Sequence, residues 1–447
     1  MPWGIVGIYL LGVFIGALDN NIVGPIFPLL MRGFHIPLAW VGWTVSAYTV
    51  TYVASTVLAG ALGDRLGHQR LYRYGVVAFG AASALAAVAP SFGIFVVARL
   101  IQGAGAGAVY PNAQAESLRH FPPEKKGTAL GMFGAVFGVA AILGPVVGGA
   151  LGEFLGWASV FWVNVPVVLV TLWAARRLPS AQREARPMPD WVGGLAFSAL
   201  LAAGLLWIMV TSRWRWAFLL LAVVLAIVFT WRQHRAAEPF LETEPLASPV
   251  GLAVMVGAAL IGLDMASAVF VPTLGQEALH YSVLDSGLAL LPAALSGAAL
   301  SGAGGVLVDR MGPKPVLVIG LLAATLGGVL LAWPGLHTLR FLVAMAVMGM
   351  GTAFTMGAPL NRIGIGLYRE NQAGQALALM AVFRSIGLAA GPVLLTAAAA
   401  GGRGFTGMFG AVAVASMVGA VLFGVAPNPL PGRKAPWGRR SGSAPLG

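Results

Sequence analysis

The eight residues GALGDRLG, at positions 60–67, return as GVLVDRMG at positions 305–312. Two copies of an Asp-Arg loop flanked by glycines, 245 residues apart, indicate an internal duplication. Other landmarks keep nearly the same spacing: Leu18-Asp19 matches Leu263-Asp264, Gly103 and Gly105 match Gly349 and Gly351, and Gly144-Pro145-Val146 matches Gly391-Pro392-Val393. The shared order and spacing predict two related halves.

The composition places these halves in a membrane. Of the 447 residues, 58% are hydrophobic and 9% are charged, and the mean hydropathy is +0.84. A soluble domain carries about 25% charged residues. Runs of roughly 20 apolar residues recur along the chain, and such runs are typical of membrane-spanning helices. We therefore predict an all-α polytopic membrane protein.

Fourteen apolar spans are predicted, and an even number puts both termini on one side of the membrane. With a cytoplasmic N-terminus, the cytoplasmic segments carry 20 Lys and Arg residues and the opposite segments carry 5. Basic residues gather in cytoplasmic loops, so we predict a multi-pass protein of the inner, cytoplasmic cell membrane with both termini in the cytoplasm. The spans lie near residues 4–30, 39–62, 72–90, 92–115, 127–151, 157–175, 191–211, 214–231, 249–273, 284–307, 315–333, 338–360, 372–398 and 404–426.

The repeat divides the chain into two six-helix halves, residues 1–185 and 241–426. Residues 186–240 are predicted to add a helix pair that packs at the periphery. Residues 427–447 are rich in Pro, Gly, Ser and Arg and are predicted to be a disordered cytoplasmic tail. Internal repeats are the usual construction of secondary transporters, whose substrate site lies near the midplane between the repeats.

Several other classes of function are disfavoured. Membrane topology explains the net charge of +12 better than nucleic-acid binding, because no basic run is interleaved with aromatic residues. The chain has no cysteine, and no nucleotide-binding loop is found. No metal site is expected at membrane depth, because the histidines lie near span ends or in loops: residues 35, 68, 120, 234, 280 and 337.

Several motifs together resemble those of the major facilitator superfamily. Gly60-x-Leu62-x-Asp64-Arg65-x-Gly67, closed by Arg70, resembles the signature loop between its helices 2 and 3. Arg99-x-x-Gln102-Gly103 resembles its helix 4 motif. Gly138, Gly144-Pro145 and Gly148-Gly149 resemble the helix 5 motif of its antiporters. The resemblance covers residues 1 to about 426 and implies the fold of that superfamily.

Within the superfamily, the chain is most similar to the fourteen-helix drug:proton antiporter branch. The matching residues are Leu18-Asp19-x-x-Ile22-Val23 with Pro28, Trp157, Asn164-Val165-Pro166 and Asp190-Trp191-x-Gly193. Some positions depart from the pattern: Asn21 stands in place of Thr, Ile26-Phe27 in place of a small-large pair, and His68-Gln69 in place of a basic pair, while Pro25 is an additional helix breaker. These departures bear on the substrate and not on the fold.

The two Asp-Arg loops are interpreted as a cytoplasmic gate. A carboxylate there can accept hydrogen bonds from the exposed N–H groups of a neighbouring helix, and in proteins of this kind such contacts join the halves in one conformation. The alternative is ordinary solvated loop charges. The gate residues are Gly60, Asp64, Arg65, Gly67, Arg70, Gly305, Asp309, Arg310 and Gly312.

The Gly-Pro pairs Gly144-Pro145 and Gly391-Pro392 are expected to bend their helices, since proline removes a backbone donor. Close helix packing at the small residues is the alternative, and both interpretations are compatible.

Four charges fall inside spans: Asp19, Asp264, Arg99 and Arg384. Charges at membrane depth are rare and usually functional, so we assign these four to proton coupling, in which each Arg tunes the local carboxylate or holds an anionic group of the cargo. Asp19 lies about halfway along the first span, where burial disfavours its ionised form, and a neutral Asp19 would cross between access states more cheaply. Alternatively, Asn20, Asn21 or Arg99 holds Asp19 as a fixed anion, and a structural salt bridge is the alternative for each Arg. The first interpretation predicts that Asp19→Asn abolishes proton-driven transport and that Asp264→Asn has a weaker effect.

Aromatic and amide side chains are candidates for a substrate cavity that accepts bulky amphipathic solutes, although packing is the alternative for each. They are Asn20, Asn21, Trp43, Tyr48, Tyr52, Gln102 and Tyr110. The methionines at 345, 348, 350 and 356 are interpreted as core filling, and Glu153 as an interfacial charge.

The sequence therefore predicts a secondary transporter and not an enzyme. The leading interpretation is a proton-coupled exporter of hydrophobic or amphipathic compounds that works by alternating access. Protons are the coupling ion, no cofactor is expected, and the partners are a small lipophilic substrate and membrane lipids around a monomer. The alternatives are export of a lipid, siderophore or other metabolite by the same fold, and a membrane enzyme.

Overall fold

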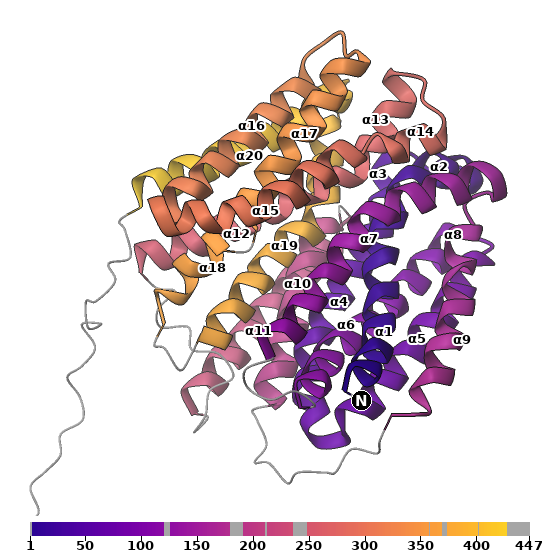
Figure 1. Ribbon diagram of the computed structural model, residues 1–447, viewed down its shortest axis with the longest axis vertical. Helices are drawn as coiled ribbons and strands as arrows, with labels where there is room; N and C mark the ends of the chain where they lie inside the picture. The colour runs from indigo at the N-terminus through magenta and orange to yellow at the C-terminus, as the bar shows by residue number, and fades with distance from the viewer. Residues whose placement is uncertain are drawn as a thin grey trace, which may run out of the picture.

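The computed structural model describes residues 2–119, 126–178, 191–210, 212–235, 248–356, 358–368, 373–400 and 402–426. These residues form helices and turns and include no β-strand, so the predicted all-α fold is confirmed (Figure 1). The predicted tail, 427–447, lies outside the described residues.

The two predicted halves contain matching series of helices. The first half contains α1 (Pro2–Ile22), η1 (Gly24–Ile26), α2 (Phe27–Phe34), α3 (Leu38–Val41), α4 (Trp43–Leu66), α5 (His68–Ala87), α6 (Phe92–Arg119), α7 (Lys126–Leu155), α8 (Ser159–Trp162) and α9 (Asn164–Ala175). The second contains α12 (Pro249–Ser267), η4 (Ala268–Phe270), α13 (Val271–Ala278), α14 (Val283–Leu288), α15 (Leu291–Met311), α16 (Pro313–Ala332), α17 (Thr338–Thr355), α18 (Ala358–Ile365), α19 (Ala373–Ala399) and α20 (Gly404–Val425). Between them lie α10 (Trp191–Met209) and α11 (Arg215–Arg235).

The first helix of each half breaks at the same place. In α1 and α12 the helix gives way to a short 3₁₀ turn, η1 or η4, a few residues after Asp19 or Asp264, and then resumes as α2 or α13. Pro25 opens η1, and Pro28 and Pro272 open the resumed helices. Proline lacks the N–H that a continuous helix needs, so the duplicated break follows from the sequence.

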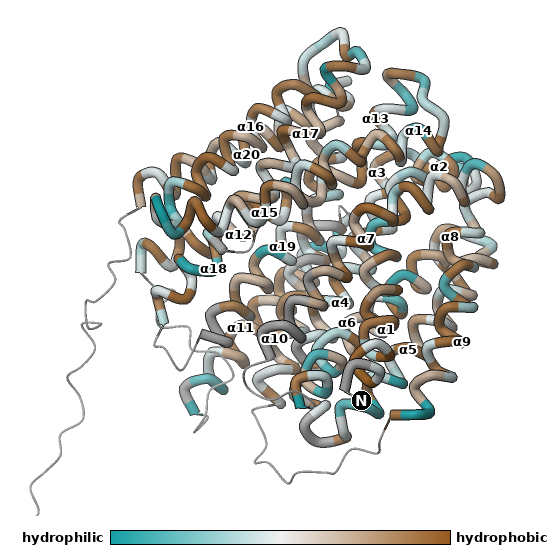
Figure 2. The backbone as a smooth tube through the Cα atoms, viewed as in Figure 1, coloured by the Kyte–Doolittle hydropathy of each residue, from teal (hydrophilic) through white to brown (hydrophobic). Residues whose placement is uncertain are grey.

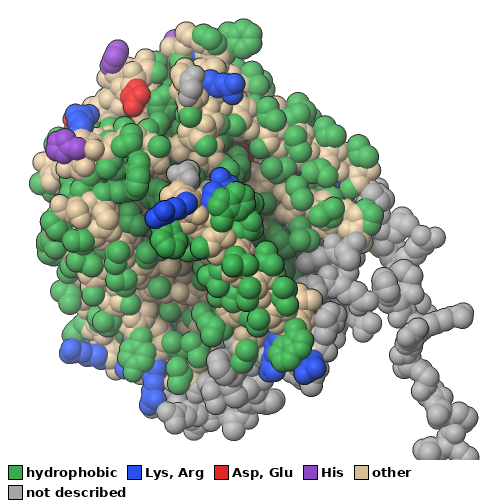
Figure 3. Space-filling view, turned by 180° about the vertical axis from the view of Figure 1, so that it is seen from behind, with side chains coloured by type: hydrophobic (Ala, Val, Ile, Leu, Met, Phe, Trp, Pro, Cys, Tyr) green, Lys and Arg blue, Asp and Glu red, His purple; other side chains and the backbone are tan. Residues whose placement is uncertain are grey.

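The surface is that of an integral membrane protein. Ten helices in the described part of the chain are long and apolar enough to cross a membrane, and 159–175 and 192–204 are shorter apolar helices. Apolar residues occupy most of the helices, and polar ones gather mainly toward turns and helix ends (Figure 2). Hydrophobic side chains also cover most of the face in Figure 3, and a soluble monomer rarely exposes so large an apolar area. The count of fourteen spans stays a prediction.

The two halves meet closely at one end of the bundle, where α2, α3, α13 and α14 gather (Figure 1). We call this the junction end, and we call the end with the turns at Gly67 and Gly312 the signature-loop end. At the junction end, a Cβ atom added to Gly149 of α7 would lie 2.9 Å from the Val283 carbonyl oxygen of α14. Glycine therefore allows α7 and α14 to approach backbone to backbone.

Polar and aromatic contacts also cross the junction end. The Glu153 carboxylate of α7 accepts hydrogen bonds from the backbone N–H groups of Val283 (2.8 Å) and Leu284 (3.3 Å). The rings of Phe27 and Phe270 lie 5.7 Å apart within one apolar core cluster. Glu153 is thus more than an interfacial charge, because it satisfies the first N–H groups of α14 in the opposite half.

The inserted hairpin lies beside the two halves. The Ser198 hydroxyl of α10 donates a hydrogen bond to the Ala54 carbonyl of α4 (3.0 Å), and Ala202 packs with Val50 of α4 and Ala389 of α19. The outer helix α11 exposes large apolar side chains such as Leu220 (65%) and Ile227 (64%). The hairpin therefore contacts both halves through α10 and presents α11 to the membrane, and its assignment as a separate unit stays a prediction.

Replacing Glu153 should loosen the junction end. Because Glu153 is exposed, water screens its charge and the contact contributes up to about 1 kcal/mol, so Glu153→Ala should open the junction end up to about fivefold more often. Because the chain has no cysteine, Val271→Cys, at a position that is 1% exposed, can report this opening through its rate of modification by a water-soluble maleimide.

Asp285→Ala is the matched control for this substitution. Asp285 accepts a hydrogen bond from Ser282 of its own half, so its loss should leave the modification rate of the Val271→Cys thiol unchanged. Equal rates in Glu153→Ala and Asp285→Ala would contradict the contribution of Glu153 to the junction.

Candidate functional site

Asp19 is completely buried in α1 and is held by three donors. Its carboxylate lies 2.5 Å from Nη1 of Arg99 and accepts hydrogen bonds from Nδ2 of Asn164 (2.9 Å) and Nε2 of Gln102 (3.3 Å). Arg99 and Gln102 come from α6, one helical turn apart, and Asn164 begins α9. Three helices of the first half thus converge on one carboxylate.

Arg99 is also completely buried and has further partners. Its Nε donates to the Thr44 carbonyl (2.8 Å) and its Nη1 donates to Oε1 of Gln102 (2.8 Å). The guanidinium carbon lies 4.6 Å from the ring centroid of Tyr48 and 5.7 Å from that of Phe161. These ring faces add cation–π attraction to the ion pair.

A hydroxyl group completes this cluster. Oγ of Ser83, on α5, accepts hydrogen bonds from Nε2 of Gln102 (2.7 Å) and Nδ2 of Asn164 (3.4 Å). We call Asp19, Ser83, Arg99, Gln102 and Asn164 the Asp19 network. A buried charge is tolerated when it is paired and hydrogen-bonded, and Asp19 meets both conditions. This geometry favours the alternative in which Arg99 holds Asp19 as a fixed anion.

The network contains residues that sequence reasoning placed elsewhere or missed. Gln102 and Tyr48, predicted to line a substrate cavity, are 0% and 3% exposed and lie in or against the network. Asn164 belongs to the Asn164-Val165-Pro166 motif, and its amide side chain could have suggested a hydrogen-bond partner for a buried acid. Ser83 lies in an ordinary small-residue stretch of α5, where no pattern distinguishes it.

The matching acid in the second half has a different environment. Asp264 is 4% exposed, and its Oδ1 atom has no hydrogen-bond partner among the described residues. At the offset of 246 that relates Gly103 to Gly349, the positions of Arg99 and Gln102 are occupied by Met345 and Met348. Both methionines belong to the apolar core. The second half therefore has the buried acid but not the arginine and glutamine that bind it in the first half.

The other predicted cavity residues divide between helix packing and the interface of the halves. Nδ2 of Asn21 donates to the Ala17 carbonyl of its own helix (2.7 Å). Asn20 is half-buried, and Trp43 packs with Val50 near α19. Tyr52 and Tyr110 are half-buried, and both lie within electrostatic reach of Arg384 in the second half. Their assignment to a cavity stays a prediction.

The Gly-Pro pairs lie within continuous helices. Pro145 lies inside α7 and Pro392 inside α19. A Cβ atom added to Gly144 would lie 2.6 Å from Cβ of Asn21, so this glycine allows close packing of α7 on α1. The geometry supports the packing interpretation, and helix bending stays a prediction.

The predicted gate is partly described. Gly67 and Gly312 end α4 and α15 with φ of +95° and +84°, a region that favours glycine. Asp309 accepts a hydrogen bond from Nη2 of Arg362 (2.7 Å), and both side chains are more than half exposed. Asp309 thus pairs within its own half, which leaves the gate role a prediction.

The remaining gate residues add little to this picture. Arg70 and Arg310 are exposed, and a Cβ atom added to Gly305 would meet open space. The side chains of Asp64 and Arg65, and the surroundings of Gly60, lie outside what the structure describes.

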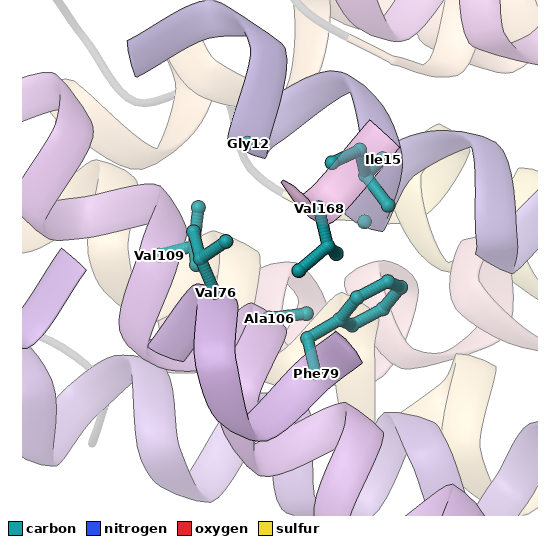
Figure 4. Close-up of a pocket in the computed structure, with 8 residues that line it drawn as sticks. Gly12, Ile15, Val76, Phe79, Ala106, Val109 and Val168 are labelled. Carbon is teal, nitrogen blue, oxygen red and sulfur yellow. The ribbon is translucent and has the colours of Figure 1, made fainter. Parts of the chain in front are cut away.

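A small apolar cavity lies one helical turn from the network on α1 and α5 (Figure 4). Its volume is about 10 Å³, which is room for one water molecule at most, whereas pockets for drug-sized ligands need about 300 Å³ or more. It is therefore a packing void and not a substrate site. Its lining residues are Gly12, Ile15, Gly16, Val76, Phe79, Ala106, Val109 and Val168.

No cluster of His, Asp or Glu that could hold a metal ion is found in the described ranges.

Comparison with known proteins finds one family. The family model described as Major Facilitator Superfamily matches residues 9–210, 191–392 and 256–446. The tetracenomycin C resistance and export protein of Streptomyces glaucescens is 33% identical over 73% of this chain and 63% of its own length. The puromycin resistance protein pur8 of Streptomyces alboniger is 29% identical over 89% of this chain and 82% of its own.

A solved structure shares the fold. The crystal structure of the peptide transporter POT in complex with sulfate superposes with a TM-score of 0.72 over 94% of this chain and 93% of that chain, at 16% identity. At this identity the likeness concerns the fold alone.

The Asp19 network should contribute strongly to stability. Arg99→Gln leaves the Asp19 carboxylate buried without its counter-charge, and breaking a buried ion pair in this way costs about 3–5 kcal/mol. Unfolding of the purified protein in detergent, followed by tryptophan fluorescence in increasing denaturant, measures the loss.

Arg384→Gln is the matched control, because no described hydrogen bond or ion pair holds that guanidinium, and it should cost less than about 1 kcal/mol. Combining Asp19→Asn with Arg99→Gln should recover most of the lost stability. Equal stabilities of Arg99→Gln and Arg384→Gln would show that the network is not a stabilising element.

Proposed function

Because the chain belongs to the Major Facilitator Superfamily, we propose that it is a proton-coupled transporter that exports hydrophobic or amphipathic compounds by alternating access. The superfamily membership makes it a transporter and not an enzyme. The names of two relatives, a tetracenomycin C resistance and export protein and a puromycin resistance protein, support small-molecule export. Protons are the proposed coupling ion, and no cofactor is needed.

The proposed setting is the cytoplasmic membrane, with the protein as a monomer surrounded by lipid and both termini in the cytoplasm. The excess of Lys and Arg in the predicted cytoplasmic segments supports this orientation. In it, the signature-loop end faces the cytoplasm and the junction end faces outward. In this orientation, the contacts of Glu153 and Phe27 with the second half support closure of the outward side.

The observation that carries proton coupling is the contrast between the two buried acids. Asp19 has a cation and two amide donors, whereas Asp264 is buried with a carboxylate oxygen that has no partner among the described residues. An unpartnered buried carboxyl group costs less when it is protonated than when it is ionised. We therefore assign proton exchange to Asp264 and a positioning role to the Asp19–Arg99 pair.

The coupling follows from the cost of moving charge. A protonated Asp264 can pass between the two access states as a neutral group, and release of its proton on the cytoplasmic side resets the cycle. The membrane potential supplies about 2.3 kcal/mol per proton for each 100 mV. The proton gradient can therefore drive cargo outward as the proton moves inward.

Neutralising Asp264 should uncouple transport. In proteoliposomes with an imposed pH gradient, Asp264→Asn should abolish gradient-driven dye export, because the neutral amide cannot exchange a proton. The double variant Asp19→Asn/Arg99→Gln should keep gradient-driven export, because it removes both charges of the fixed pair together. Export rates are compared per folded protein after size-exclusion chromatography.

Asp285→Asn is the control, because it removes an exposed carboxylate of the same half. Full gradient-driven export by Asp264→Asn would refute the assignment of Asp264. If the double variant lost gradient-driven export and Asp264→Asn kept it, proton exchange would be assigned to Asp19 instead. Proton movement stimulated by lipids and by none of a panel of dyes and antibiotics would favour lipid export over drug export.

A further inference from the structure

Arg384 is a cation in the middle of a membrane-spanning helix. It is the twelfth residue of α19, which runs from Ala373 to Ala399, so at 1.5 Å per residue it lies about 17 Å from one end and about 22 Å from the other. Charged side chains at this depth are costly and usually face a partner or a substrate pathway.

Among the residues that the structure describes, none provides a counter-charge to Arg384. In the described part of the chain, no hydrogen bond or ion pair involves its guanidinium, whereas Arg99 binds a carboxylate, a carbonyl and an amide. Asp264 lies on α12, which packs tightly on α19 through Gly262 and Gly387, yet it forms no ion pair with Arg384. The charge of Arg384 is therefore available to a ligand.

Two tyrosines of the opposite half lie near this cation. The phenol groups of Tyr52 on α4 and Tyr110 on α6 lie within electrostatic reach of Arg384. The ring of Tyr52 stacks on Tyr48 with centroids 6.0 Å apart, and that of Tyr110 meets the ring of Phe137 at 5.5 Å. Because α4 and α19 pack together through Val50 and Ala389, Arg384 and these aromatic side chains lie in the same part of the interface between the halves.

In the internal repeat, the position equivalent to Arg384 in the first half is occupied by an apolar residue. At the offset of 247 that relates Gly144-Pro145 to Gly391-Pro392, Arg384 corresponds to Phe137. Both residues lie near Tyr110, Phe137 by ring contact and Arg384 by electrostatic reach. Equivalent positions of the two halves therefore supply a lipophilic surface and a positive charge to the same region.

We propose that Arg384 is the anion-binding residue of the substrate site, and that the cargo is a lipophilic anion with an aromatic body and a carboxylate, phenolate or phosphate group. The inference rests on the proposed export function and narrows its substrate class. A guanidinium is weakly hydrated and binds such groups through two parallel hydrogen bonds. The aromatic body packs on Tyr52, Tyr110 and Phe137 by offset or edge-to-face contact, and cationic and neutral compounds of the same shape leave the guanidinium unpaired.

The test compares two dyes with the same three-ring body and opposite charge, the anion fluorescein and the cation rhodamine 123. Binding to the purified protein in nanodiscs is followed by fluorescence polarisation. Wild-type protein should bind fluorescein more tightly. Arg384→Gln should weaken fluorescein binding by about tenfold or more, the range expected for loss of a charge-assisted hydrogen bond, and should leave rhodamine 123 binding unchanged or tighter.

Two further variants separate charge from folding. Arg384→Lys keeps the positive charge but lacks the planar guanidinium group that makes two parallel hydrogen bonds. It should therefore retain part of the preference for fluorescein. Arg340→Gln removes an arginine of the same half whose guanidinium binds the Trp333 and Pro334 carbonyls at the surface, and it should change neither affinity. Tighter binding of rhodamine 123 by the wild type, or an Arg384→Gln variant that binds fluorescein as the wild type does, would overturn the inference.

Transport in proteoliposomes distinguishes this inference from the proposed function. Preferential fluorescein binding that depends on Arg384, without gradient-driven export of either dye, would support the anion site and contradict proton-coupled export. Gradient-driven export of rhodamine 123 by a protein that does not bind fluorescein would support export and contradict the anion site.

Discussion

The ion pair between Asp19 and Arg99 is the interaction on which the first half depends. Two opposite charges, both completely buried, tie α1 to α6, and their amide and hydroxyl neighbours bring in α5 and α9. Lipid cannot solvate either charge, so separating these helices would strand a charge in an apolar medium. The first half is therefore held as a rigid body by polar bonds that a hydrophobic environment strengthens.

The second half keeps the same helices with different chemistry. Met345 and Met348 occupy the positions of Arg99 and Gln102, so apolar packing replaces the polar bonds there. The charges inside the predicted spans of this half are one acid, Asp264, and one base, Arg384, and no ion pair joins them among the described residues. The two halves thus share a helical scaffold, but only the first has a buried ion pair at membrane depth among the described residues.

The sequence was sufficient for the fold and for naming Arg99 as a candidate partner of Asp19, but it was insufficient for the other partners of the buried charges. The repeat of Asp-Arg loops and the recurring apolar runs predicted two helical halves. This prediction was possible because helices and repeats follow from local sequence patterns and their order along the chain. The partnership of Asp19 with Asn164 joins residues 145 positions apart, and such pairs depend on how helices rotate against each other. Glu153 illustrates the same limit, since its contact with α14 arises only when the two halves are docked.

The junction end has a thermal consequence. Phe27, Phe270 and Val271 are among the buried residues of one apolar cluster that extends across both halves, so opening this end would bring apolar surface into contact with water. Exposure of apolar surface raises the heat capacity, and the hydrophobic contribution weakens on cooling. The balance between the closed and open junction should therefore shift toward opening in the cold, which makes temperature a determinant of whether the two halves stay docked at this end.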